Sequence, residues 1–159
     1  MKMKNSDIMD LYQGLVGTSN LTGVKFCYAI ARNIKKLEAV VESVQIASIP
    51  PEIFKEYEQE RRQFAQKSSK KDEKGNPVTE VVNDVKRFVM SDSNAFEAGF
   101  KVIKEKHKEA LQKRKEQLEE VRELLKVETE IDLFTIPTSC IPEEVNTKQM
   151  TAIMPIIKD

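Results

Sequence analysis

The residues with the clearest chemical spacing are three carboxylates near the C-terminal end, Glu128, Glu130 and Asp132. They alternate with apolar or small residues over positions 127–133, a pattern typical of a half-buried strand. Alternate residues of a strand share one face and lie about 7 Å apart, so the three carboxylates would form an acidic ridge. Such a ridge could hold a divalent ion or contact a basic partner. The alternative is the solvent-exposed face of a two-stranded ribbon whose other strand carries lysines.

The densest basic segment spans positions 101–115, where seven basic residues stand against two acidic ones. As a nucleic-acid site it lacks interleaved aromatic residues and glycines. The open alternatives are an exposed charged helix face and a contact with an acidic protein surface or a phosphate backbone. The candidate partner-binding residues of this segment are Lys101, Lys104, Lys108, Lys113, Arg114 and Lys115.

Residues for catalysis or for zinc are few. The chain has one histidine, His107, and two cysteines, Cys27 and Cys140. A general base needs a nucleophile or an orienting acid nearby, and no motif supplies one. A closed zinc site needs four Cys or His ligands, more than the chain contains. We therefore expect neither an enzyme nor a bound metal or cofactor, with reduced thiols and Cys27 in the core of an apolar helix.

The elements that would position these residues are mostly helical. Positions 1–4 alternate apolar and basic residues, which predicts a short strand, and Asn5 or Ser6 then caps a first helix. A second helix follows from apolar residues at steps of three and four between Phe26 and Val44. Pro51 starts a third helix, which a polar loop over positions 68–77 ends.

The second half of the chain continues the helical pattern. Positions 78–89 fit a helical period, although their valines would also suit a strand, and we predict a helix there. Asn94 with Glu97 resembles a capping box that starts a helix over positions 95–126. That helix would be about 48 Å long, so in a compact protein it must project, bend or break. A last short helix is expected from Asn146 or Thr147.

The predicted fold is therefore mainly α, a helical bundle with a long central helix. A small two-stranded β ribbon adds the N-terminal strand to a strand near positions 127–134, where Lys2 and Lys4 would oppose the acidic residues. At 159 residues the chain has the size of one domain. Its 26 basic and 26 acidic residues cancel, which disfavours a dedicated nucleic-acid binder. With no long apolar run and no signal peptide pattern, we expect a cytoplasmic protein that does not contact a membrane.

Three stretches carry a family resemblance: KMKNSDI at positions 2–8, KDEKGNPV at 71–78, and ETEIDL at 128–133 followed by a Met-Pro helix at 150–157. In this order they resemble small uncharacterised proteins of phages and prophages of low-GC Gram-positive bacteria. In overall length and look the chain is also similar to the staphylococcal anti-CRISPR proteins, which inhibit Cas9. The resemblance implies an origin in a mobile element inside a bacterial host cell, and it carries over no functional residue.

Three functions remain open from the sequence. The first is an inhibitor that binds a host protein, such as a Cas9-type nuclease, and covers a working surface. The second is a phage assembly factor that self-associates through Leu111, Leu118 and Leu125 at heptad spacing. The third is a nucleic-acid accessory protein that uses the basic segment, and its binding would weaken steeply with salt.

Overall fold

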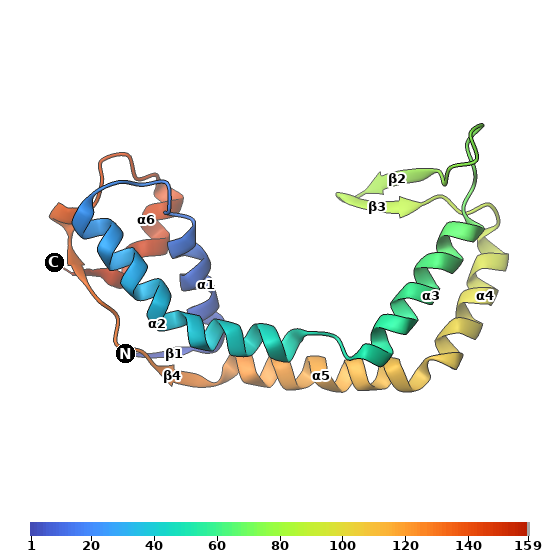
Figure 1. Cartoon of the computed structure of the whole chain (residues 1–159), viewed down its shortest axis with the longest axis horizontal. Helices are drawn as coiled ribbons and strands as arrows, with labels where there is room; N and C mark the ends of the chain where they lie inside the picture. The colour runs from blue at the N-terminus through green and yellow to red at the C-terminus, as the bar shows by residue number, and fades with distance from the viewer. Residues whose placement is uncertain (159) are drawn as a thin grey trace. The chain divides into compact units, whose positions relative to one another are not determined.

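The computed structural model describes residues 1–158, and its fold is mainly α with small two-stranded sheets (Figure 1). Contacts between Cα atoms divide the chain into two compact units. Unit 1 comprises Met1–Ile49 and Leu118–Asp159, and unit 2 comprises Pro50–Gln117. The sequence led us to expect one domain over positions 1–159, so the insertion of one compact unit into another is a feature that the apolar pattern did not reveal.

Two predicted helices form the centre of unit 1. Helix α1 (Asn5–Val16) and helix α2 (Val24–Ser48) bury apolar residues at helical spacing against each other. Phe26, Leu15 and Ile8 are fully buried in this core. Cys27 was predicted to be buried but is exposed, because it lies one residue past the buried stripe of α2. Its thiol contacts the Leu21 carbonyl oxygen at 3.5 Å.

The predicted β ribbon is present, and the lysines of its N-terminal strand oppose acidic residues as predicted. Strand β1 (Lys2–Lys4) pairs antiparallel with strand β4 (Glu128–Glu130), so that Lys2 lies opposite Glu130 and Lys4 opposite Glu128. The strand is shorter than positions 127–133, and Val127 is exposed rather than half-buried. The ribbon is joined to α1 by Asn5, whose Nδ2 donates to the Leu124 carbonyl and whose Oδ1 accepts from the Thr129 hydroxyl.

The C-terminal segment of unit 1 packs on α1. Helix α6 (Thr147–Ile153) starts where predicted, and Asn146 and Gln149 form a capping box at its first turn. A Cβ on Gly14 would lie only 2.6 Å from the Ala152 Cβ, so the two helices approach closely at this glycine. The 3₁₀ turns η1 (Thr138–Cys140) and η2 (Met154–Ile156) flank α6 in the chain. Strand β5 (Ile136–Pro137) pairs parallel with strand β6 (Ile157–Lys158), which the sequence did not indicate.

Unit 2 is built around a pair of helices. Helix α3 (Glu52–Ser68) packs on helix α4 (Ser93–Lys106), with Tyr57 and Ile103 buried between them. A Cβ on Gly99 would meet the ring of Phe64 at 2.4 Å, so this contact also depends on a glycine. Helix α4 is capped by Asp92, whose Oδ1 accepts from the Ala95 N–H, rather than by the predicted pair of Asn94 and Glu97.

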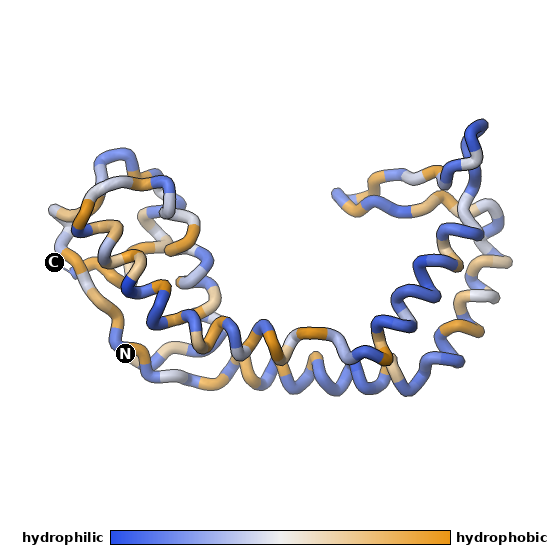
Figure 2. Tube along the Cα trace, viewed as in Figure 1, coloured by the Kyte–Doolittle hydropathy of each residue, from blue (hydrophilic) through white to orange (hydrophobic). Residues whose placement is uncertain are grey.

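The helix predicted for positions 78–89 is wrong, because this segment is a β hairpin. Strand β2 (Thr79–Val82) pairs antiparallel with strand β3 (Val85–Phe88). The two turn residues, Asn83 and Asp84, have φ values of 51° and 61°, as a two-residue I′ turn requires. Positive φ at two consecutive residues cannot be accommodated in a right-handed helix. Figure 2 shows apolar residues along both strands, and Val81 is 69% exposed.

The long predicted helix is broken at His107. Helix α4 ends before this residue, whose φ and ψ of −103° and 24° are not helical, and helix α5 (Lys108–Lys126) begins after it. The break is one of the outcomes that the helix length predicted. Of the described residues, none belongs to a helix that is both long and apolar enough to cross a membrane.

Candidate functional site

A groove of about 790 Å³ lies within unit 2, between α3, strand β3 and the first turns of α4. We call it the basic-rimmed groove. In Figure 1, β3 is the strand of the hairpin on the side of α3. The groove is lined by Glu58, Gln59, Arg61, Arg62, Ala65, Val85, Lys86, Arg87, Phe88, Met90, Phe96 and Phe100.

The floor of the groove is apolar and comes from an aromatic stack between α3 and α4. The rings of Phe64 and Phe96 stack at 5.4 Å between centroids, and those of Phe96 and Phe100 stack at 5.7 Å. Phe88, the last residue of β3, and Met90, two residues further on, extend this floor and are themselves only partly buried. Much of each ring face therefore contacts a neighbouring ring, which holds the floor of the groove in place.

The rim of the groove is cationic. Arg61 and Arg62 come from α3, and Lys86 and Arg87 come from β3, whereas Glu58 is the one acidic residue of the lining. Among residues 1–158, none of the four cations lies within ion-pair distance of a carboxylate. A concave apolar surface with an unbalanced cationic rim is suited to a ligand that presents both apolar and negatively charged groups.

The predicted acidic ridge lies in unit 1, and its charges are partly compensated there. Glu128 and Glu130 stand opposite the two lysines of β1, as described above. Asp132 lies beyond the strand and forms an ion pair of 3.0 Å with Lys36, which also donates to the Asp132 backbone carbonyl. The hydrogen bond from Lys36 holds the pKa of the Asp132 carboxyl below its ordinary value of 3.8. Within the described residues no group of His, Cys, Asp and Glu side chains is arranged to hold a metal ion.

The predicted basic segment divides into paired and unpaired residues. Lys108 forms an ion pair of 3.7 Å with Glu105 across the break between α4 and α5, and Lys113 forms one of 2.7 Å with Glu109 within α5. Lys104 lies over the ring of Phe100 at 4.4 Å. Arg114 lies over the ring of Phe54 and donates to Gln117, while Lys101 and Lys115 are exposed. The segment is therefore in part a set of contacts internal to unit 2 rather than one uniform cationic surface.

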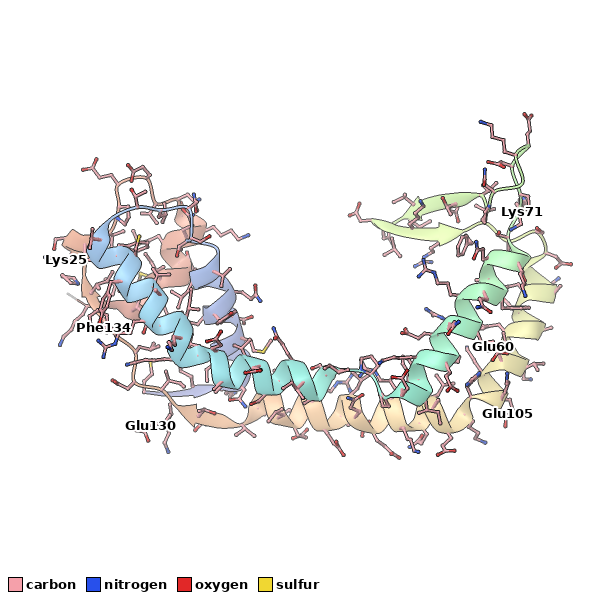
Figure 3. All side chains as sticks on the ribbon, viewed as in Figure 1. Lys25, Glu60, Lys71, Glu105, Glu130 and Phe134 are labelled. Carbon is pink, nitrogen blue, oxygen red and sulfur yellow. The ribbon has the colours of Figure 1, made fainter. Side chains whose placement is uncertain are left out.

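His107 is a structural residue of the contact between α3 and α4. Its Nε2 lies 2.7 Å from Oε2 of Glu60, and the same oxygen accepts a hydrogen bond from Lys106. Glu60 is labelled on α3 in Figure 3. The ring of His107 meets Tyr57 edge-on at 5.6 Å, and the His107 side chain is only 11% exposed. The hydrogen bonds with His107 and then Lys106 lower the pKa of Glu60 below its ordinary value of 4.5. Glu60 therefore stays charged at neutral pH and joins the two helices.

The heptad leucines do not form one free stripe. Leu111 packs into the cluster around Tyr57 in unit 2, whereas Leu118 is 41% exposed. Leu111, the first of the three leucines, thus contributes to the core of unit 2.

The sequence reasoning missed every residue of the groove. Arg61 and Arg62 belong to no recognisable motif, and residues 85–88 fall within the helix predicted for positions 78–89. The available signal was the Asn83-Asp84 pair between two valine-rich runs, which is typical of a hairpin. A hairpin there would have placed its basic residues beside α3, but the aromatic floor depends on tertiary packing.

Comparison with known proteins yields no relative: no family model, no curated protein and no solved structure matches this chain.

Proposed function

We propose that this protein acts by binding another protein through the basic-rimmed groove of unit 2. The proposed target is a host defence effector, and the first candidate is a Cas9-type nuclease, as the resemblance to phage and anti-CRISPR proteins implies. The observation that carries the proposal is the groove itself, with four cations against one carboxylate above an aromatic floor. Arginine, phenylalanine and methionine, all present in the lining, are enriched in protein interfaces relative to the rest of the surface.

The charge of the rim selects the kind of surface that fits. Arg61, Arg62 and Arg87 present guanidinium groups, which bind carboxylates through paired hydrogen bonds. An acidic patch of a partner protein satisfies them, and the carboxylates that hold metal ions in a nuclease site are one such patch. Binding there would exclude the metal or the nucleic acid, which is how a small protein without chemistry of its own can inhibit a nuclease.

The aromatic floor favours a protein over a nucleic acid. Single-stranded nucleic acids bind by stacking bases on free aromatic faces. The ring of Phe96 is instead stacked between those of Phe64 and Phe100. The chain as a whole is also neutral, with 26 basic and 26 acidic residues, so it lacks the positive excess of a nucleic-acid binder.

The test is recovery of a partner by the tagged protein from a lysate of Gram-positive cells that carry a CRISPR locus, read by mass spectrometry. The groove variant is Arg61→Glu/Arg62→Glu. The control variant is Lys70→Glu/Lys74→Glu, which makes the same charge change at two exposed loop residues outside the groove lining. We expect the groove variant to recover at least about tenfold less of a stoichiometric partner than the control, since several charge-assisted contacts are reversed.

A second assay addresses the target directly. DNA cleavage by a purified Cas9-type nuclease from the same host should be inhibited by the unaltered protein and by the control variant, but not by the groove variant. Equal partner recovery by both variants would contradict the groove as the binding site. Recovery of a partner other than a nuclease would leave the binding function and remove the proposed target.

A further inference from the structure

We infer that the groove binds its partner as an added β strand: an extended acidic segment of the partner pairs with the free edge of β3. This inference rests on the proposed function and adds the conformation and chemistry of the bound segment. Addition of a strand to an exposed sheet edge is a common mode of peptide recognition, because the backbone supplies affinity and flanking side chains supply specificity.

The groove follows the edge of β3 rather than one face of the hairpin. All four residues of the strand, Val85, Lys86, Arg87 and Phe88, line the groove, and no residue of β2 does. Consecutive strand residues point to opposite faces. A surface that touches four in a row must therefore run along the strand at its side, and this side is the one away from β2.

The hydrogen-bond pattern of the hairpin leaves that edge available. Val82 and Val85 flank the two-residue I′ turn and so form the hydrogen-bonded pair that closes it, and at the other end of the ladder the Val89 N–H donates to the Val78 carbonyl at 3.0 Å. Hydrogen-bonded and non-hydrogen-bonded residue pairs alternate along an antiparallel ladder. The backbone N–H and C=O groups of Arg87 therefore point toward β2, whereas those of Lys86 and Phe88 point away from it. Nothing in the described part of the chain bonds to these four backbone groups. An edge strand with unpaired backbone groups beside an apolar floor is a template for one more strand.

The side chains around this edge define the partner. A strand placed beside β3 has Lys86 on one face and Arg87 on the other, and it has Arg61 and Arg62 on the opposite wall of the groove. Acidic residues on both faces of the added strand would therefore be matched by cations. At least one apolar side chain is needed to cover Phe88 and the stacked rings. The partner segment is thus about four extended residues that mix acidic and apolar side chains, and a nucleic acid does not use the strand edge.

The probe is a random octapeptide library displayed on phage and selected on the immobilised full chain, with the variant Arg61→Glu/Arg62→Glu as the counter-selection. We expect the selected peptides to be enriched in Asp and Glu with interspersed apolar residues. The best peptide is then synthesised with N-methyl groups on one or the other set of alternate residues, and its Kd is measured by fluorescence anisotropy. One methylated form should bind at least about tenfold more weakly, because it cannot donate to β3, and the other should bind as the parent does.

Amide hydrogen exchange gives a second readout at named residues. In the peptide complex, the amides of Lys86 and Phe88 should exchange at least about tenfold more slowly than in the free protein, since binding buries and pairs them. The amide of Arg87, which already faces β2, should change less.

The outcomes separate this inference from the proposed function. If binding requires Arg61 and Arg62 but both methylated forms bind like the parent, strand addition is wrong and the groove function stands. If the library yields no peptide that depends on these arginines, or a single-stranded DNA 20-mer displaces the selected peptide, both proposals fail.

Discussion

Asn33 and Phe134 are joined by two hydrogen bonds of 2.8 Å: Asn33 Nδ2 donates to the Phe134 carbonyl, and the Phe134 N–H donates to Asn33 Oδ1. Asn33 is fully buried in the apolar stripe of α2. The ring of Phe134, which lies beside α2 in Figure 3, meets Tyr28 edge-on and lies 4.8 Å from the Arg32 guanidinium. One buried amide thus fixes an irregular segment of backbone on a helix.

Asn33→Leu should destabilise unit 1 by about 2–4 kcal/mol, because it removes both bonds and leaves buried backbone groups unpaired. The measurement is urea unfolding followed by tyrosine fluorescence in a Tyr57→Phe background. Tyr12 and Tyr28, both in unit 1, are then the remaining tyrosines. Asn94→Leu, at an exposed position of α4, is the control and should change stability by less than about 0.5 kcal/mol. Equal effects of the two substitutions would show that the buried amide contributes nothing specific.

Gly14→Ala should destabilise unit 1 by about 1–3 kcal/mol, even though alanine favours a helix over glycine. The added Cβ would lie 2.6 Å from the Ala152 Cβ, and neither backbone can move without separating α1 from α6. Ala152→Gly in the same chain removes the clash and should restore most of the loss. Thermal unfolding of the two single variants and the double variant gives the coupling. Additive effects would mean that the two residues are not in contact.

Asp84→Gly should stabilise the hairpin by about 0.5–1 kcal/mol, because Asn-Gly is the preferred pair for a I′ turn and Asp84 has a positive φ. Slower amide exchange at Val82 and Val85 would report the gain. If the segment were a helix, the same glycine would destabilise it by about 1 kcal/mol. The sign of the change therefore decides between the two structures.

The pH dependence of the stability of unit 2 should reflect protonation of Asp72, which lies in the polar loop over positions 68–77. Its carboxylate accepts hydrogen bonds from the backbone N–H groups of Asn76 and Lys74 at 2.7 Å and 2.9 Å. The bond from Asn76, the largest of these effects, lowers the pKa of Asp72 below its ordinary value of 3.8. A group with a lowered folded-state pKa stabilises the fold above its unfolded pKa, and that contribution is lost as the pH falls through the folded value.

Asp72→Asn should therefore lower the stability of unit 2 at pH 7, and the difference from the unaltered protein should shrink as the pH falls below 3.8. Unfolding at a series of pH values checks this, and a carboxyl NMR titration of Asp72 should have its midpoint below 3.8. Glu73→Gln, at the next exposed residue, is the control. A difference that stays constant down to the lowest pH would rule out the charged form of Asp72 as the cause.

The elements that could be predicted are those whose signal is local. The stripe of α2, the proline at the start of α3 and the capping box at Asn146 each depend on residues within a few positions. That the lysines of positions 2 and 4 oppose acidic residues was also predictable from two alternating segments of opposite charge. The charges alone would allow Lys2 to pair with either Glu130 or Asp132, so the register itself was not.

The errors arise where local patterns are ambiguous or where packing decides. The valines at positions 78–89 fit both the helical and the strand periodicity, and the turn at Asn83 was the decisive signal for a hairpin. His107 breaks a helix without a glycine or proline, through its contacts with Glu60 and Tyr57. Asn33 lies at helical spacing between Ile30 and Leu37, so a polar residue in a buried stripe was a readable sign of a specific bond. The groove joins three segments, and its shape is a property of unit 2 as a whole.

The placement of unit 2 between the two segments of unit 1 sets an order for events at the ribosome. Asn33 and Phe134 are 101 residues apart in sequence, and Asn5 and Thr129 are 124 apart. Their hydrogen bonds cannot form until Pro50–Gln117 has been synthesised and released. The helix pair and hairpin of unit 2 draw on no later residues, so unit 2 can complete its fold before unit 1 does. Throughout that interval β1 lacks its partner strand β4 and Asn33 lacks Phe134, which makes the nascent N-terminal segment the part of this chain most dependent on chaperones.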